Sequence, residues 1–148
     1  MDFPRLKSEL IEDPQSRGYS DKSPTEQAIL INSNYKNVIR PITMAELVIW
    51  LIGVDGFYKL QSIQMGHPAY SLAYGFLSIV GNPQIEKLHL DDIRVAQMAD
   101  ALVGLGVFTI EEKNSLFAMA TTQTSRANEL GLGEVSEGHI SEALGGTY

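Results

Sequence analysis

The sequence predicts an all-α fold, a compact array of seven or eight short helices with extended N-terminal loops. Two observations favour helices: start signals of the Ser/Thr-x-x-Glu type recur along the chain, and apolar residues follow them at helical spacing. A third observation argues against strands, because apolar and polar residues scarcely alternate. The exception is residues 37–40, and the Pro41 that follows them cannot donate a ladder hydrogen bond.

In the first part of the chain, three predicted helices are separated by polar segments. Residues 4–12 form the first helix, because Leu6 and Leu10 lie one turn apart and Asp13-Pro14 disfavours continuation. A polar loop follows over residues 14–22. The sequences 23–26 and 43–46 are capping boxes, in which hydroxyl and carboxylate reciprocally accept from free amides, and they predict helices over 24–32 and 44–53. Residues 33–41 between these helices form a polar extended arm.

The second part of the chain consists of short segments that each follow a start signal. The segments and their signals are 56–65 (Asp55), 69–80 (Pro68), 93–103 (Asp91 or Asp92), 110–121 (Thr109 with Glu112), 126–130 (Ser125) and 137–144 (Ser136). Most of them end at glycine, which allows the left-handed backbone of a helix C-terminus. All are therefore interpreted as helices.

Length and composition are those of an ordinary globular protein. The chain has 148 residues, of which 44% are hydrophobic and 20% charged, so residues 1–148 are predicted to form a single helical domain. Residues 1–22 and 131–148 are predicted to be arms that contact other chains, because such segments gain order on assembly. The chain lacks cysteine, which excludes disulfides, thiolate metal sites and cysteine nucleophiles.

The charge is acidic and unevenly distributed. The formal net charge is -7, and residues 1–42 carry six basic and six acidic side chains against five and twelve in residues 43–148. Because clustered Lys and Arg are absent, direct binding of nucleic acid is not expected. The apolar runs 44–54 and 69–80 are shorter than the roughly 20 residues of a membrane span, so no membrane contact is expected. Alternating charges near the N-terminus indicate no secretory signal and predict synthesis in a cytoplasm.

Residues that could support catalysis or metal binding have a simpler structural interpretation. The histidines are His67, His89 and His139, far apart in the sequence. Asp91 and Asp92 follow His89, but carboxylates there suit the positive end of a helix, as do Glu111 and Glu112. No Gly-x-Ser-x-Gly elbow occurs. We therefore predict no catalytic residue, metal site, cofactor or small-molecule substrate, and expect that the protein is not an enzyme.

Aromatic residues gather in the most apolar third of the chain. Most of them are expected in the core. Tyr70 and Tyr74 lie one helical turn apart and would form a candidate partner surface if they are exposed.

Both ends of the chain resemble a known group of proteins. Residues 125–135 read Ser-Arg-Ala-Asn-Glu-Leu-Gly-Leu-Gly-Glu-Val, and the N-terminal part contains Leu-Lys-Ser-Glu-Leu at 6–10, Asp-Pro at 13–14 and Arg-Gly-Tyr at 17–19. These segments resemble small, largely uncharacterised proteins from the structural gene modules of tailed bacteriophages. Residues 36–92 are only generically similar to those proteins, so any feature specific to this protein is expected in that part of the chain.

The resemblance implies a non-enzymatic virion component, associated with the tail or baseplate. Its partners would be other phage structural proteins, including copies of itself. The candidate partner-contact residues are Tyr19, Tyr70, Tyr74, Arg126 and Glu129. The alternative is a small acidic phage protein that inhibits a host protein or assists assembly, an interpretation motivated by the charge of -7.

Overall fold

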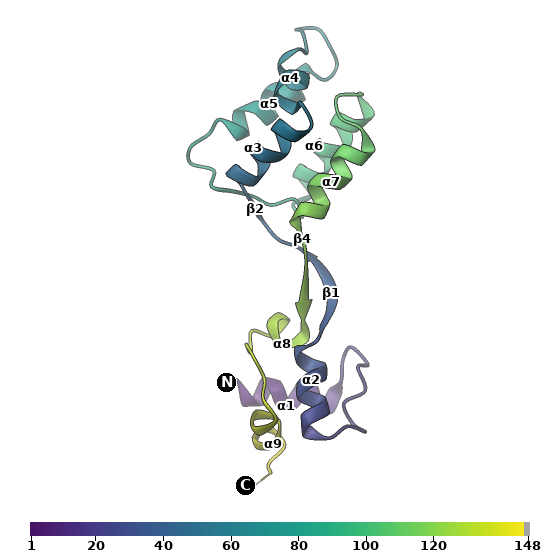
Figure 1. The fold of residues 1–148 in the computed structure, drawn as a ribbon, viewed down its shortest axis with the longest axis vertical. Coiled ribbons are helices and arrows are strands. Elements are labelled where there is room, and N and C mark those ends of the chain that lie inside the picture. The colour runs from purple at the N-terminus through teal and green to yellow at the C-terminus, as the bar shows by residue number, and fades with distance from the viewer. Residues whose placement is uncertain (147–148) are drawn as a thin grey trace. The chain divides into compact units, whose positions relative to one another are not determined.

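The computed structural model of the chain describes residues 1–146, which are mostly helical with a small β component. The helices are α1 (Phe3–Glu12), α2 (Pro24–Asn32), α3 (Met44–Gly53), α4 (Gly56–Gln61), α5 (Tyr70–Val80), α6 (Ile93–Gly104), α7 (Ile110–Ala120), α8 (Arg126–Glu129) and α9 (Glu137–Ala143). The strands are β1 (Asn34–Ile39), β2 (Ile42–Thr43), β3 (Lys87–Leu88) and β4 (Thr121–Ser125) (Figure 1). Residues 147 and 148 of the predicted C-terminal arm lie outside the described residues.

The predicted all-α class is wrong, because 55% of the chain is helical and 10% forms two small antiparallel sheets. Strand β1 pairs with β4, and β2 pairs with β3 with Ile42 opposite Leu88. The described residues form nine helices rather than seven or eight. The strands lack an alternating pattern because β1 and β4 are almost entirely exposed and β2 and β3 have two residues each. Backbone pairing, rather than burial of one face, defines them.

The single domain predicted for residues 1–148 comprises two compact units. Unit 1 consists of Met1–Val38 and Gln123–Tyr148, and unit 2 consists of Ile39–Thr122. The boundaries fall inside β1 and β4, which are hydrogen-bonded neighbours. The chain therefore leaves unit 1 in one strand and returns to it in the paired strand.

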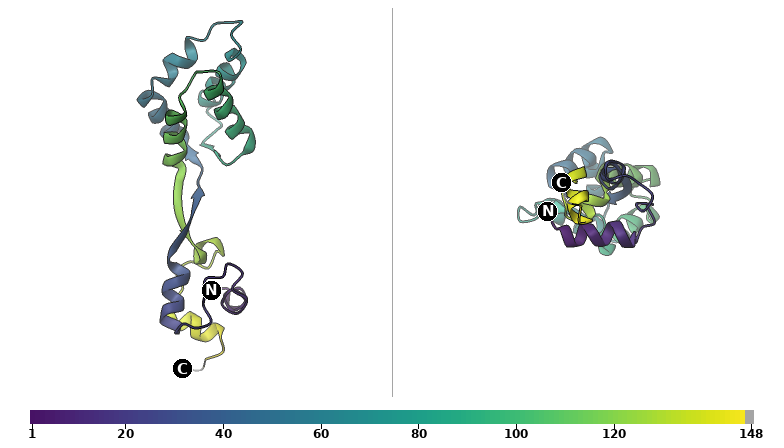
Figure 2. Two further views of the ribbon diagram at one scale, coloured as in Figure 1. Left: turned by 90° about the vertical axis from the view of Figure 1, so that its right-hand side faces the viewer. Right: turned by 90° about the horizontal axis from the view of Figure 1, so that it is seen from below.

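The core of unit 1 is built from both ends of the chain. Its buried members are Leu6, Leu10, Tyr19, Ala28, Ile31, Ala127, Leu132, Val135, Ile140 and Ala143. Helices α1 and α9, from opposite ends of the sequence, pack side by side (Figure 2). Residues 1–22 and 131–146, predicted as arms, thus supply core side chains, and whether they also contact other chains stays a prediction.

The loop over residues 14–22 is folded back rather than extended, which corrects the predicted N-terminal loops. Asp13 has φ 42° and ends α1 in the left-handed conformation. Its carboxylate accepts hydrogen bonds from the backbone amides of Arg17 at 2.7 Å and Gly18 at 2.6 Å. This turn places Tyr19 in the core, where its side chain is 0% exposed.

Side-chain hydrogen bonds to backbone also join the two ends in unit 1. The Asn32 side chain donates to the carbonyl of Val135 at 2.6 Å and accepts from the amide of the same residue at 3.0 Å. Arg5 donates to the carbonyl of Leu130 at 3.0 Å. Because buried backbone groups must find partners, these contacts fix the irregular segment between α8 and α9.

Unit 2 contains helices α3 to α7 and the short sheet β2–β3. Its buried core consists of Ile42, Leu47, Trp50, Leu51, Leu60, Ala73, Phe76, Leu88, Leu90, Leu102, Phe108, Leu116 and Ala120. The capping box at Thr43 starts α3 and that at Thr109 starts α7, as the sequence predicted, and the box at Ser23 likewise starts α2 in unit 1. Local capping thus sets these three helix starts.

Helix α4 is shorter than predicted, ending at Gln61 instead of Met65. Asp55 makes no capping hydrogen bond with its side chain and adopts φ 54°. Beyond the helix, Ile63 packs against the core of unit 2 from a non-helical segment. This tertiary contact overrides the weak local preference for a longer helix.

We predict that a polypeptide of residues 39–122 folds alone, because every member of its hydrophobic core lies within those residues. Far-UV circular dichroism should report helix, and urea unfolding followed by Trp50 fluorescence should be cooperative. In that polypeptide Leu47→Ala should lower the free energy of unfolding by about 2–5 kcal/mol, since Leu47 is fully buried. A gradual, non-cooperative loss of signal would contradict the prediction.

Candidate functional site

The strongest charged cluster of unit 1 is an ion pair between α1 and α8. Arg126 Nε donates to Glu9 Oε1 at 2.9 Å and Arg126 Nη2 donates to Glu9 Oε2 at 2.8 Å. The Glu9 side chain is 2% exposed and that of Arg126 is 14% exposed. A two-pronged guanidinium–carboxylate contact fixes orientation as well as distance. The pair therefore sets the position of the C-terminal segment on α1.

A second carboxylate extends this cluster towards β1. Glu129 accepts hydrogen bonds from Lys36 Nζ at 2.8 Å, from the Tyr35 hydroxyl, and from Arg126 Nη1 at 3.0 Å. These three donors, with Lys36 contributing most, lower the pKa of Glu129 to about 2. Glu129 is consequently a carboxylate throughout the neutral and mildly acidic range.

Tyr35 is held from both sides. The guanidinium of Arg17 lies over its ring at 4.2 Å from the centroid, while its hydroxyl donates to Glu129. Arg17 also donates to the carbonyl of Leu30 and, at 3.0 Å, to the hydroxyl of Ser33. The motif residue Arg17 thus joins the end of α2 to β1.

The chemistry of this cluster is that of fixed charges. Hydrogen bonding to Glu9 raises the pKa of Arg126 further above its ordinary value. Burial raises the pKa of Tyr19 to about 12, and its hydroxyl has no hydrogen-bond partner among the described residues. Arg126, Tyr19 and Glu129 therefore keep their protonation states near neutral pH.

Of the five predicted contact residues, three lie in unit 1 and have other roles there. Arg126 and Glu129 were expected on the exposed side of their helix. Glu129 is exposed as a residue, although its side chain is only 19% exposed, whereas the Arg126 side chain is 14% exposed. Both belong to the ion-pair cluster. Tyr19 lies in the core.

The two predicted residues of unit 2 lie on α5. Their rings stack with centroids 6.4 Å apart, and Tyr74 is 66% exposed while Tyr70 is half-buried. They border a shallow hollow of about 240 Å³. Its lining residues are Leu60, Gln61, Ile63, Tyr70, Ala73, Tyr74 and Leu77. The structure therefore brings the two rings together, but of the two only Tyr74 is exposed, so a partner surface at this place stays a prediction.

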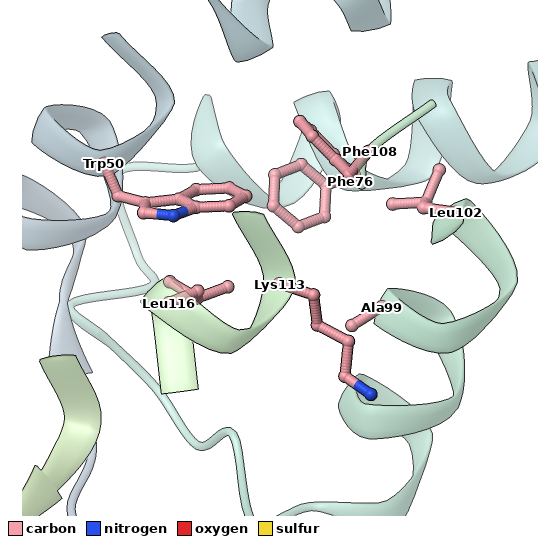
Figure 3. Close-up of a pocket in the computed structure, with 7 residues that line it drawn as sticks. All are labelled: Trp50, Phe76, Ala99, Leu102, Phe108, Lys113 and Leu116. Carbon is pink, nitrogen blue, oxygen red and sulfur yellow. The ribbon is translucent and has the colours of Figure 1, made fainter. Parts of the chain in front are cut away.

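A small apolar cavity lies beside Trp50 in unit 2. Figure 3 shows its lining residues, Trp50, Phe76, Ala99, Leu102, Phe108, Lys113 and Leu116. It holds about 20 Å³, room for roughly one water molecule, and its lining surface is apolar. The indole nitrogen of Trp50 is already used, donating to the hydroxyl of Ser115 at 3.0 Å. The cavity is therefore a packing gap of the core.

The residues considered for metal binding or catalysis have structural contacts. Asp92 caps α6 by accepting from the amide of Arg94 at 2.8 Å, and Glu112 pairs with Lys59. His89 Nδ1 lies 3.7 Å from Asp91 Oδ1 on the surface. Within residues 1–146, no three His, Asp or Glu side chains converge as a metal site would require.

Comparison of the chain with protein-family models, with curated proteins and with solved structures gives no match. Among the helices of residues 1–146, none combines the length and apolar character needed to cross a membrane.

Sequence reasoning missed Glu9, Tyr35 and Lys36 as members of the cluster. A signal for Glu9 was present, because it lies three residues after Leu6 and next to Leu10 and so shares their buried face. A carboxylate on an apolar helix face requires a buried partner. Tyr35 and Lys36 carried no such signal, because they lie on an exposed strand.

We predict that Arg126→Ala lowers the free energy of unfolding of unit 1 by about 3–5 kcal/mol, because it leaves the Glu9 charge buried and unpaired. Hydrogen exchange of residues 1–38 and 123–146 measures this loss, while Trp50 fluorescence should report unchanged unit 2 stability. Adding Glu9→Gln to Arg126→Ala should recover part of the loss by removing the charge. The matched control Lys36→Ala, at an exposed pair, should cost less than about 1 kcal/mol.

We predict that lowering the pH reduces the free energy of unfolding of unit 1, because Glu129 becomes protonated. Its pKa is about 2 in the folded chain against an ordinary 4.5, so the unfolded chain binds more protons between these values. The stabilisation is complete above pH 4.5 and is lost as the pH falls towards 2. Hydrogen exchange across this window should show a smaller acid-induced loss in Glu129→Gln than in the parent chain. An equal loss in both would contradict this account; Glu134→Gln, an exposed carboxyl, is the control.

Proposed function

We propose that this chain is a non-enzymatic structural component of a tailed-phage virion, associated with the tail or baseplate and acting through protein–protein contacts. Its partners are other structural proteins of the particle, including further copies of the chain. The proposal starts from the resemblance of residues 6–10, 13–14, 17–19 and 125–135 to proteins of phage structural gene modules.

One observation carries the proposal further than the resemblance alone. The resembling segments come from opposite ends of the chain, yet they pack into the same unit. Glu9 from the first segment and Arg126 from the last form the two-pronged ion pair. The two segments that carry the resemblance therefore belong to one folded unit, and the proposal assigns the resemblance to that unit as a whole.

The contacts of the shared segments also support a structural role. Asp13 accepts the hydrogen bonds that hold a turn, Arg17 joins α2 to β1, and Arg126 donates to Glu129. These four residues have pairing functions that need no substrate. Unit 2 contains most of residues 36–92, which resemble the phage proteins only generically. It is then the part that adapts the protein to its own partners.

Mass spectrometry of purified particles tests the proposal. The chain should be present in a fixed ratio to the tail proteins through successive density-gradient steps. A phage carrying Arg126→Ala should yield particles that lack the chain, because unit 1 is destabilised, whereas Lys36→Ala should leave it in place. Complete absence of the parent chain from particles would overturn the proposal.

A second measurement distinguishes the virion role from the alternative, a small acidic protein that inhibits a host protein or assists assembly. The net charge of -7 favours a basic partner if the chain acts as an inhibitor or assembly factor. Capture of the chain from infected cells should then recover one host protein in an amount equal to that of the chain, and the binding should weaken as the salt concentration rises. Recovery of tail proteins instead would support the virion role.

A further inference from the structure

The two halves of unit 1 must be brought together before its core can form. The buried core is shared equally between residues before Val38 and residues after Gln123, and residues 39–122 separate the two halves. If residues 39–122 were a flexible loop, its closure would lower the folding equilibrium constant of unit 1 by roughly 100- to 1,000-fold, because the entropy cost grows with loop length.

The strands that connect the halves do not supply this closure by themselves. Strands β1 and β4 form a sheet of only two strands, and most of their residues are exposed. An isolated pair of strands is marginally stable in water, because it buries little apolar surface. Another part of the chain must therefore hold the two connections together.

Unit 2 holds its own two ends together through Arg40. The backbone amide of Arg40 donates to the carbonyl of Ala120 at 2.9 Å. The side chain of Arg40 donates to the carbonyl of Met119 at 3.2 Å and to the two carboxylate oxygens of Glu46 at 2.7 and 3.2 Å. Glu46 caps the first turn of α3, and Met119 lies in the last turn of α7. Arg40 thus joins the point where the chain enters unit 2 to the point where it leaves.

These contacts form within unit 2 alone. Arg40, Glu46, Met119 and Ala120 all lie within residues 39–122, and so does every member of the core that supports them. When unit 2 is folded, residues 40 and 120 are adjacent in space. The two halves of unit 1 are then linked as if by a short turn, and the entropy cost of a long flexible loop is removed.

We propose that the folding of unit 2 promotes the folding of unit 1 by closing the chain at Arg40 and Ala120. The effect comes from the entropy of closure, so it requires no bound ligand. Thermodynamic linkage makes the effect reciprocal, but each unit responds only when the other is unfolded. A unit 1 that is weakened yet still folded leaves the unfolding of unit 2 unchanged. The proposal does not rest on the virion role, because it concerns the purified chain alone.

A full-length chain in which unit 2 is unfolded tests the proposal. Leu47→Asp and Leu102→Asp together place two charges at core positions that are 0% and 1% exposed, and Trp50 fluorescence should report that unit 2 is unfolded. Hydrogen exchange of residues 1–38 and 123–146 should then become roughly 100-fold faster, or reach the unprotected rate where protection is smaller. Exchange at the parent rate in this chain would overturn the proposal.

The same two charges on the surface of unit 2 provide the matched control. Ile49 and Ile93 are 68% and 69% exposed, and they lie on the same helices as the two core leucines, α3 and α6. A chain with Ile49→Asp and Ile93→Asp should keep unit 2 folded, and unit 1 should exchange as it does in the parent chain. Faster exchange of unit 1 in this control would show that added charge, not unfolding, is responsible and would overturn the proposal.

A crosslink separates closure from every other effect of unfolding unit 2. The chain has no cysteine, so Arg40→Cys and Ala120→Cys, added to the chain with unfolded unit 2, can form a single disulfide at the two positions named in the proposal. The oxidised chain should exchange at least about tenfold more slowly in unit 1 than the reduced chain, because the disulfide closes the same loop. Equal exchange in the oxidised and reduced chains would overturn the proposal.

Discussion

The ion pair between Glu9 and Arg126 is the constraint on which unit 1 depends. A carboxylate that is 2% exposed is stable in a protein interior only beside a fixed positive charge. The partner comes from the other end of the chain, so the folded unit requires both ends at once. Arg126 then positions Glu129, which in turn orders Tyr35 and Lys36 on β1. One buried charge thus connects α1, α8 and the start of the strand pair.

This dependence explains how the chain is divided. Because the ends meet in unit 1, everything between β1 and β4 leaves and returns through two paired strands. Unit 2 has a hydrophobic core of its own, so its sequence can change without disturbing the contacts of Glu9 and Arg126. The proposed virion role uses this division, with unit 1 holding both segments that carry the resemblance and unit 2 free to make contacts of its own.

Both units carry ion pairs on their surfaces. In unit 1 hydrogen bonds lower the pKa of Glu129 to about 2, and in unit 2 Arg40 pairs with Glu46 and Lys59 with Glu112. In unit 2 the segment 60–85 is uncharged, and α3 leaves Ile49 and Ile52 in solvent.

Local chemistry in the sequence determined where most helices begin. The boxes at Ser23, Thr43 and Thr109 act between residues three apart, so they form whatever the rest of the chain does. The proximity of Tyr70 to Tyr74 followed from the same short spacing. By contrast, β1 and β4 are defined by pairing between segments far apart in sequence. Residues 37–40 gave a weak strand signal within β1, and β4 gave none. The burial of Arg126 against Glu9 likewise depends on residues 117 positions apart, and only the tertiary structure brings them together.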